Sequence, residues 1–160
     1  MTLTQLADGA WVDTEPVRIV GMPLTSTMTV LRLGDGTLLL HSPVRLTPER
    51  RAAVQALGPV AHLYAPNTYH HLWIGEWSAA FPDAQLHAPA ELRAKRPELR
   101  IDRTYDQGSE LVDEVRVEGF RLQEVVVHHE ASRTLVIADL AHNIGRDRKS
   151  TRLNSSHVSE

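Results

Sequence analysis

The sequence predicts a protein of the α/β or α+β class, in which helices cover a largely central sheet. Three observations lead to this prediction. Apolar runs of strand character alternate with short amphipathic segments, one of these segments has plain helix-capping residues, and two β-rich runs flank a Gly-Asp-Gly turn. With 42% hydrophobic residues among 160, the chain can bury a real core. We therefore expect one layered domain, without internal repeats.

The first half of the chain combines strands with one well-marked helix. A short strand is expected around Trp11, and the run "TMTVLRLGDGTLLLHSP" predicts a hairpin around Gly34-Asp35-Gly36, because glycine accepts the positive φ of such turns. The segment "LTPERRAAVQALG" predicts a helix, since it has a threonine N-cap, proline at the first helical position and glycine just past its end. A core strand should follow over residues 60–66.

The second half continues the alternation and ends in β-rich sequence. A helix over residues 71–81 should bury Leu72, Trp73 and Trp77. The segments after it are, in order, a short strand in "AQLHAP", a short helix in "PAELRAKRP", a polar loop over 98–113 and β-rich runs near 114–118, 121–128 and 133–139.

Composition and charge narrow the function classes. With 17 Lys and Arg against 20 Asp and Glu, and no basic stripe, nucleic acid is not an expected partner. The N-terminus lacks signal-peptide features, and no apolar run approaches the roughly 20 residues of a membrane helix, so we expect a cytoplasmic protein without a membrane partner. Without cysteine, any metal ion must bind through His, Asp, Glu or water.

The last fourteen residues, 147–160, do not continue the hydrophobic pattern before them. One permitted reverse translation of residues 147–157 resembles a sequencing-library adapter read in frame. We therefore expect the domain to span residues 1–146 as an incomplete copy, and residues 147–160 to be a disordered, non-native tail.

Two adjacent histidines, His70 and His71, lie in "APNTYHHLWIGEW", where a hydrophobic strand gives way to an apolar helix. Imidazole and carboxylate groups are common zinc ligands, and Asp139 ends a later hydrophobic strand. Neighbouring helical residues point about 100° apart, so both histidines can reach one ion only if His70 precedes the helix. The alternative is that the pair caps the helix and bonds backbone carbonyls.

Three motifs together resemble the metallo-β-lactamase-like superfamily of metallo-hydrolases and oxidoreductases. These are the hairpin ending in "LLLHSP", the segment "LYAPNTYHHLWIGEW" at the place of a His-x-His-x-Asp-His motif, and "RTLVIADLAHN" at the place of a late strand that ends in a bridging aspartate. The spacing of "PNTYHHLWIGEW", "KRPEL" and "SRTLVIADLAHN" resembles, more narrowly, an uncharacterised bacterial domain-of-unknown-function family within that superfamily. The resemblance implies a partial αββα sandwich.

Residue by residue, the resemblance implies a reduced metal site. His71 matches the final histidine of the motif, His70 takes the place of its aspartate, and Asp139 matches the bridging aspartate. Pro66 and Thr68 fall where the two leading histidines should be, and neither is a useful zinc ligand. The resemblance therefore implies at most one zinc, iron or manganese ion, or none, with His71, His70 and Asp139 as its ligands.

Further candidates lie near these positions. The superfamily's third histidine would fall around residues 119–123, where there is none, although Glu124 and the pair His128-His129 follow closely. Adjacent strand residues face opposite ways, so at most one of that pair can face a site. His41 ends a strand near any such site, but we expect a neighbouring carbonyl to satisfy it.

Two functions remain open on the sequence. One is a metal-dependent hydrolase with a degenerate, at most single-metal site, in which His70 binds the metal or carries a proton and a metal-bound water attacks an ester, lactone or thioester. The other is a non-catalytic scaffold that binds a small molecule or a protein partner. The absence of a Gly-x-Ser-x-Gly elbow gives a serine hydrolase little support. Whether the chain is an active enzyme, and its oligomeric state, are not predicted.

Overall fold

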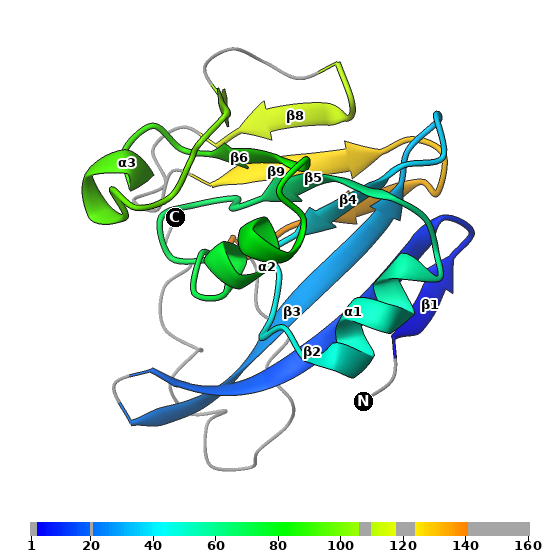
Figure 1. Ribbon diagram of the computed structural model, residues 1–160. Coiled ribbons are helices and arrows are strands. Elements are labelled where there is room, and N and C mark those ends of the chain that lie inside the picture. The colour runs from blue at the N-terminus through cyan, green and yellow to red at the C-terminus, as the bar shows by residue number, and fades with distance from the viewer. Residues whose placement is uncertain (1–2, 20, 106–109, 118–123, 141–160) are drawn as a thin grey trace, which may run out of the picture.

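The computed structural model describes residues 3–19, 21–105, 110–117 and 124–140, which form two sheets and three helices. The larger sheet has seven strands in chain order, and the smaller has three. Helices α1 and α2 lie on one face of the larger sheet, and the smaller sheet lies on the other (Figure 1). The predicted tail, 147–160, and the position of the superfamily's third histidine lie outside the described residues.

The larger sheet joins an antiparallel half to a parallel half. β1 to β4 pair antiparallel, and β4 to β7 pair parallel. The strands are β1 (Thr4–Ala7), β2 (Ala10–Ile19), β3 (Met22–Arg32), β4 (Leu38–His41), β5 (Val60–Tyr64), β6 (Gln85–Ala88) and β7 (Arg103–Thr104). The parallel strands end at one edge, where the chain enters loops and helices. Ligand sites of such sheets lie outside the carboxyl ends of the strands.

The smaller sheet is an antiparallel meander near the end of the described chain. It consists of β8 (Asp113–Arg116), β9 (Val125–His129) and β10 (Thr134–Val136), with β9 in the centre. Val127 and Val136 pack with Leu39 and Tyr64 of the larger sheet. These contacts make the inter-sheet core.

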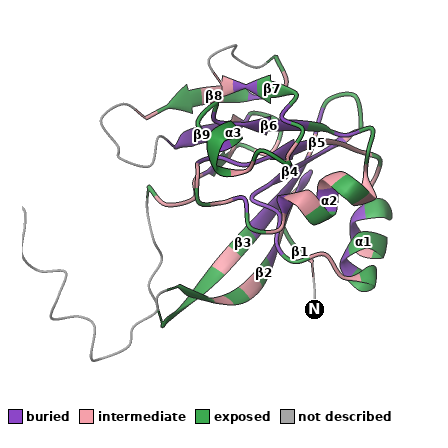
Figure 2. Ribbon diagram, turned by 60° about the vertical axis from the view of Figure 1, so that its left-hand side comes forward, coloured by how far each residue is buried: buried purple, intermediate pink, exposed green. Residues whose placement is uncertain are grey.

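A second core lies between the larger sheet and the helices α1 (Pro48–Gln55), α2 (Ile74–Ala80) and α3 (Leu92–Lys95). Side chains of a strand alternate between its faces, so Leu38 and Leu40 of β4 face the helices while Leu39 faces the second sheet. Trp77 is fully buried, and its indole N–H donates to the Val44 carbonyl at 2.6 Å. Buried residues therefore concentrate in the central strands (Figure 2).

Local signals in the sequence account for the best-predicted elements. The Thr47 side chain caps α1 by accepting from the Arg50 backbone N–H at 3.2 Å, with Pro48 at the first helical position as predicted. The hairpin between β3 and β4 turns at Gly36, whose φ is +83°. The Asp35 carboxylate stabilises this turn by accepting from the Thr37 N–H and hydroxyl.

Several predicted elements differ from those in the structure. Residues 4–7 form a strand that the sequence did not predict, and the predicted loop over 98–113 contains β7, which adds a parallel strand beside β6. The prediction that Leu72 is buried was wrong, because α2 begins at Ile74 and Leu72 is 52% exposed in the turn before it. Strand pairing between distant segments and a late helix start leave little trace in local sequence.

The strand predicted around Trp11 is one arm of a long ribbon. β2 and β3 stay paired from Ala10↔Leu31 to Ile19↔Met22, well past the ends of their neighbours β1 and β4. Exposed residues cover this outer part of the ribbon (Figure 2).

A buried ion cluster fixes α1 against the start of the ribbon. The Arg50 guanidinium is 6% exposed and donates to the Asp13 carboxylate at 2.8 Å and to the Glu15 carboxylate at 2.7 Å. It also donates to the carbonyls of Thr14 and Arg45. Every one of these donors and acceptors lies at the junction of the helix with the sheet.

None of the helices in the described part of the chain has the length and apolar character that a membrane span requires.

We predict that Arg50→Ala lowers the free energy of unfolding by about 3–5 kcal/mol, because it leaves the buried Asp13 carboxylate without its partner. Urea unfolding followed by circular dichroism measures this. The matched control is Arg51→Ala, which removes the next side chain on the exposed face of α1 and should cost less than about 1 kcal/mol. Equal losses in the two variants would contradict the assigned role of Arg50.

Candidate acid–base site

Four polar side chains meet where the carboxyl ends of β4 and β5 approach the segment after β10. Ser42 follows β4, Asn67 and His70 lie between β5 and α2, and Asp139 follows β10. The site thus joins both sheets. Its position at the ends of parallel strands is where sheets of this kind bind ligands.

Asn67 holds the loop that carries His70. Its carbonyl oxygen accepts from the backbone N–H groups of Tyr69 at 2.8 Å and His70 at 2.9 Å, which fixes the turn. Its amide group donates to the Asp139 carboxylate at 2.9 Å and reaches Glu124 at 3.4 Å. Asn67 is fully buried, so this one side chain sets both the path of the loop and the distance to the second sheet.

Glu124 holds the segment that carries Asp139. Its carboxylate accepts from the backbone N–H groups of Ala138 at 2.7 Å, Asp139 at 2.6 Å and Leu140 at 3.1 Å. The residue is fully buried beside β9, and the next N–H, that of Val125, donates to the Pro66 carbonyl at 3.0 Å. The acidic side chain therefore serves as a template for the loop, because its oxygens are satisfied by backbone donors.

The His70 ring lies between a carboxylate and a hydroxyl. Its Nε2 is 3.1 Å from Asp139 Oδ1, and its Nδ1 is 2.6 Å from Ser42 Oγ. An ionised carboxylate can only accept, so Nε2 carries the proton and Nδ1 accepts from the serine hydroxyl. The His70 and Asp139 side chains are 20% and 19% exposed, so the pair is partly open to solvent.

Ser42 has a left-handed backbone conformation, with φ of 52°. This conformation costs a residue other than glycine about 1–2 kcal/mol. Backbone contacts on both sides hold it there, because the Ser42 N–H donates to the Tyr64 carbonyl at 2.8 Å and the Val44 carbonyl is bound by Trp77.

His71 contacts Arg96 of the segment after α3. Its Nδ1 accepts from the Arg96 guanidinium at 2.8 Å, and that guanidinium also donates to the His71 carbonyl. Burial, together with the positive charges of Lys95 and Arg96, lowers the pKa of His71 and keeps it neutral. Of the two predicted histidines, it is therefore His70 that meets Asp139. The roles of His70, His71 and Asp139 as metal ligands stay predictions.

His41 is almost completely buried, and within the described part of the chain its Nε2 has no hydrogen-bond partner. We expected a neighbouring carbonyl to satisfy this histidine, and its side chain does bond its own backbone, but the second nitrogen is left over. Burial, and then the nearby charge of His70, lower the pKa of His41 to about 3. A neutral imidazole with one unpaired nitrogen thus lies close to His70.

The donor set does not fit a metal ion among the described residues, where no group of three or more His, Asp and Glu side chains is arranged to hold one. Both nitrogens of His70 are engaged, a cation faces His71, and backbone N–H groups occupy the Glu124 carboxylate. Pro66 and Thr68 offer no replacement for imidazole. What these residues can do is hold and move a proton.

A second histidine pair lies deeper in the inter-sheet layer. His62 Nδ1 is 3.1 Å from His87 Nε2, and the His87 ring stacks on Tyr64 with centroids 4.4 Å apart. Burial first, and then the neighbouring His62 ring and the Arg103 guanidinium, lower the pKa of His87 to about 3. Burial also lowers the pKa of His62. Both imidazoles are therefore neutral in the folded protein.

Three further polar residues, the candidates His128 and His129 together with Glu76, have structural contacts away from the site. His128 is half-exposed and pairs with Asp113 on the surface, while His129 is buried and lies 3.0 Å from the Arg32 carbonyl. The expectation that these neighbours face opposite ways is met. Glu76 of α2 accepts from the Leu46 N–H at 2.9 Å and so ties the helix to the loop after β4. His142 and Asn143, which follow Asp139 in the sequence, lie outside the described residues.

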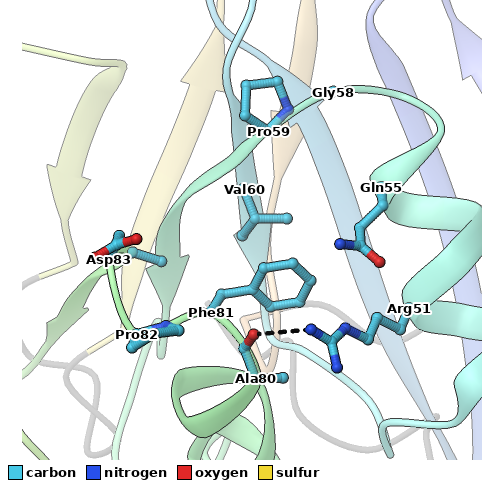
Figure 3. A pocket seen from close by; sticks show the side chains of 10 residues that line it. Arg51, Gln55, Gly58, Pro59, Val60, Ala80, Phe81, Pro82 and Asp83 are labelled. Atoms are coloured by element: carbon cyan, nitrogen blue, oxygen red, sulfur yellow. Dashed lines mark hydrogen bonds between the residues drawn. The ribbon is translucent and has the colours of Figure 1, made fainter.

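A separate groove of about 460 Å³ lies at the opposite end of β5 (Figure 3). The ends of α1 and α2 line it, together with the chain that enters β5 at Gly58 and Pro59. The Arg51 guanidinium lies 5.5 Å from the centre of the Phe81 ring and donates to the Ala80 carbonyl at 3.4 Å (Figure 3). The groove does not reach His70, which follows the other end of β5.

Comparison with known proteins gives the fold. No model of a known protein family matches the sequence, and no curated protein sequence matches it. Among solved structures, a metallo-β-lactamase from Hirschia baltica matches with a TM-score of 0.57 and 13% identity, over 84% of this chain and 68% of that one. The chain has the metallo-β-lactamase fold. This confirms the predicted fold class, while the narrower resemblance to one bacterial family stays a prediction.

Two further matches show how wide the fold is. The FIM-1 metallo-β-lactamase from Pseudomonas aeruginosa, in its mono-zinc form, matches with a TM-score of 0.51 and 14% identity, over 79% of this chain and 63% of that one. A fragment named diflavin flavoprotein A 5 from Nostoc sp. matches with a TM-score of 0.60 and 11% identity, over 84% of this chain and 64% of that one. The chain corresponds to about two thirds of these proteins, and one fold carries different functions among them.

Sequence reasoning missed Ser42 and Asn67. Ser42 lay in the quoted strand end "LLLHSP", but nothing local indicates that a serine there meets a histidine 28 residues later. Asn67 offered a better signal, because an asparagine between Pro66 and a helix start is typical of a side chain that bonds the backbone two or three residues on.

We predict that Glu124→Gln lowers the free energy of unfolding by about 2–4 kcal/mol, because an amide NH₂ would face backbone donors in place of a carboxylate oxygen. Chemical denaturation measures the loss. The matched control is Glu130→Gln, an exposed change in the turn after β9, which should stay within about 0.5 kcal/mol. A Glu124→Gln protein as stable as the native one would contradict the template role.

We predict that the protein loses stability as the pH falls from about 6.5 towards 3. His41 and His87 have a folded pKa of about 3, below the value of 6.5 in the unfolded chain. In this window the unfolded state binds one more proton per histidine, so each lowers the unfolding free energy by about 1.4 kcal/mol per pH unit. Urea unfolding at several pH values measures the slope. His87→Gln should make it shallower, and an unchanged slope would count against the prediction.

Proposed function

We propose that this protein is a hydrolase of small acyl compounds, such as an ester, a lactone or a thioester. His70 moves the proton, and Asp139 orients the His70 ring. The observation that carries the proposal is that both nitrogens of the His70 ring are hydrogen-bonded, Nε2 to a carboxylate and Nδ1 to a hydroxyl. A histidine with one nitrogen held by a carboxylate and the other facing a hydroxyl is the arrangement of a general base.

Rigid positioning supports the proposal. The Asn67 side chain accepts from the backbone N–H of His70, and the Glu124 carboxylate accepts from that of Asp139. The backbone at both residues is therefore held in place by a buried side chain. The Asp139 carboxylate sets the tautomer of His70, which leaves Nδ1 unprotonated and able to take a proton from the Ser42 hydroxyl that it contacts. Acid–base catalysis of this kind contributes about 10²–10⁴-fold to rate.

A metal-dependent form of the same hydrolase follows from the resemblance to the metallo-β-lactamase-like superfamily. The resemblance implies His71, His70 and Asp139 as ligands of a single zinc, iron or manganese ion. His70 and Asp139 could be two of its donors once the His70 ring gave up its present hydrogen bonds, whereas the Arg96 guanidinium occupies His71 Nδ1. A catalytic zinc usually has about three protein ligands, so this form needs a donor beyond the described residues. Metal content therefore distinguishes the two forms of the hydrolase.

The rival proposal is a non-catalytic scaffold that binds a small molecule or a protein partner at the same edge. Pro66 and Thr68 at the positions of the leading histidines support it, since neither is a useful zinc ligand. In this case the contact between His70 and Asp139 would only join the two sheets.

The test is hydrolysis of p-nitrophenyl acetate, and of a panel of small lactones and thioesters, by the native protein and its variants. We predict that His70→Ala and Asp139→Asn each lower kcat by about 10²–10⁴-fold. The matched control is His128→Ala, which removes a histidine with the same 3.1 Å contact to an aspartate on the surface, and should leave the rate unchanged.

Elemental analysis of the same proteins separates the remaining outcomes. Activity together with one zinc, iron or manganese per chain, lost in both variants, would support the metal-dependent form. Activity without metal would support acid–base catalysis by His70 itself. No turnover of any substrate by the native protein, with or without added metal, would overturn the hydrolase and favour the scaffold.

A further inference from the structure

Ser42 has the contacts of a nucleophile. Its Oγ lies 2.6 Å from His70 Nδ1, and the Nε2 of the same ring lies 3.1 Å from the Asp139 carboxylate. With Nε2 protonated, the direction of proton movement is fixed, from the Ser42 hydroxyl to Nδ1. Hydroxyl, imidazole and carboxylate in this order are the parts by which serine hydrolases activate a hydroxyl, whatever the fold.

The backbone at Ser42 supports a chemical role for the side chain. Only two residues other than glycine have positive φ in the described part of the chain, Ser42 and Arg133. Arg133 lies in the tight turn between β9 and β10, where its N–H donates to the Glu130 carbonyl. Ser42 instead lies at the end of a buried parallel strand, where glycine would relieve the conformation but would remove the hydroxyl.

We propose that Ser42 is the nucleophile of this site and carries the acyl group of a small ester as a covalent intermediate, with His70 as its base and Asp139 as the group that orients His70. This inference rests on the proposed hydrolase function and deepens it. The low exposure of Ser42, 3%, limits the substrate to small acyl groups such as acetyl.

The reaction balances with the groups present. Ser42 Oγ attacks the acyl carbon and forms a carbon–oxygen bond while its proton passes to His70 Nδ1. The bond from the acyl carbon to the alcohol oxygen breaks, and His70 returns the proton to that oxygen. Water then attacks the acyl carbon and gives its proton to Nδ1. The bond from that carbon to Ser42 Oγ breaks, the acid leaves, and the proton returns from Nδ1 to Oγ. No oxidant, reductant or further reactant is needed.

A buried, unpaired nitrogen lies beside the proposed nucleophile. His41 directly precedes Ser42, and its Nε2 has no hydrogen-bond partner among the residues that the structure describes, although the residue is only 1% exposed. An unsatisfied buried polar atom is costly, and a polar atom of a bound ligand could satisfy it.

The chain contains a matched control for this arrangement. Ser132 Oγ also lies 2.6 Å from a histidine, at His129 Nδ1. The other nitrogen of that ring lies 3.0 Å from the Arg32 carbonyl, so no carboxylate stabilises a charged ring there. The inference therefore requires reaction at Ser42 and none at Ser132.

The experiment uses the full chain with two probes, p-nitrophenyl acetate for turnover and methanesulfonyl fluoride for labelling. The sulfonyl fluoride reacts with an activated serine by forming an oxygen–sulfur bond and releasing fluoride, and peptide mass spectrometry locates it. We expect the label on Ser42 in the native protein, none on Ser132, and none on Ser42 in His70→Ala. Ser42→Ala and Ser42→Gly should lower turnover by at least about 10²-fold, while Ser132→Ala should not.

Stability measurements keep the test decisive. Ser42→Gly relieves the left-handed conformation, so its Tm should equal or exceed the native value, and its loss of turnover cannot then be assigned to unfolding. Turnover retained within about threefold in both Ser42 variants, but lost in His70→Ala, would overturn the nucleophile and leave the hydrolase, with water as the attacking group. Neither turnover nor labelling in the native protein would overturn both.

Discussion

The carboxylate of Glu124 is the contact on which the site depends. It is fully buried, and it accepts from three consecutive backbone N–H groups that lead into and past Asp139. Without these donors a buried carboxylate would cost several kcal/mol, and without the carboxylate the three N–H groups would be unpaired. The segment after β10 therefore has one favourable path, and this path places Asp139 against the larger sheet.

The larger sheet provides the matching half of the site. Its strands β4 and β5 are parallel, so their carboxyl ends lie side by side, and the residues that follow them meet although they are far apart in sequence. Asn67 completes the connection, since its carbonyl shapes the loop at His70 while its amide reaches Asp139 and Glu124. The fully buried Asn67 amide thus links the segment after the smaller sheet to the loop that carries His70. The distance between His70 and Asp139 is set by packing of two sheets and not by either side chain alone.

The sequence predicted what local chemistry determines. The cap and first turn of α1 and the Asp-Gly turn before β4 are set by residues within four positions of one another, and the structure has both. The same local reasoning could not separate His70 from His71, because the choice depends on Asp139, 69 residues beyond His70, and on Arg96, 25 residues beyond His71. Strands β1 and β7 were missed for a related reason: two to four residues become a strand only through their partners. The alternation of strand and helix patterns predicted the fold class, and the partial αββα sandwich could be predicted because motifs from both sheets resembled one superfamily.

Two polar clusters differ in their effect on the stability of the fold. At Arg50 the charged groups lie at the junction of α1 with β2, with carboxylates and carbonyls around the guanidinium, and such a cluster serves stability. At the end of β4, a serine is held in a left-handed conformation and the neighbouring histidine has an unpaired buried nitrogen. Glycine at position 42 and an apolar residue at position 41 would build the same strand end at lower cost. A scaffold that only binds a partner has no need of these two residues. Acyl transfer from a bound substrate would use the Ser42 hydroxyl and its base, His70, directly. Backbone strain of this kind is typical of functional sites.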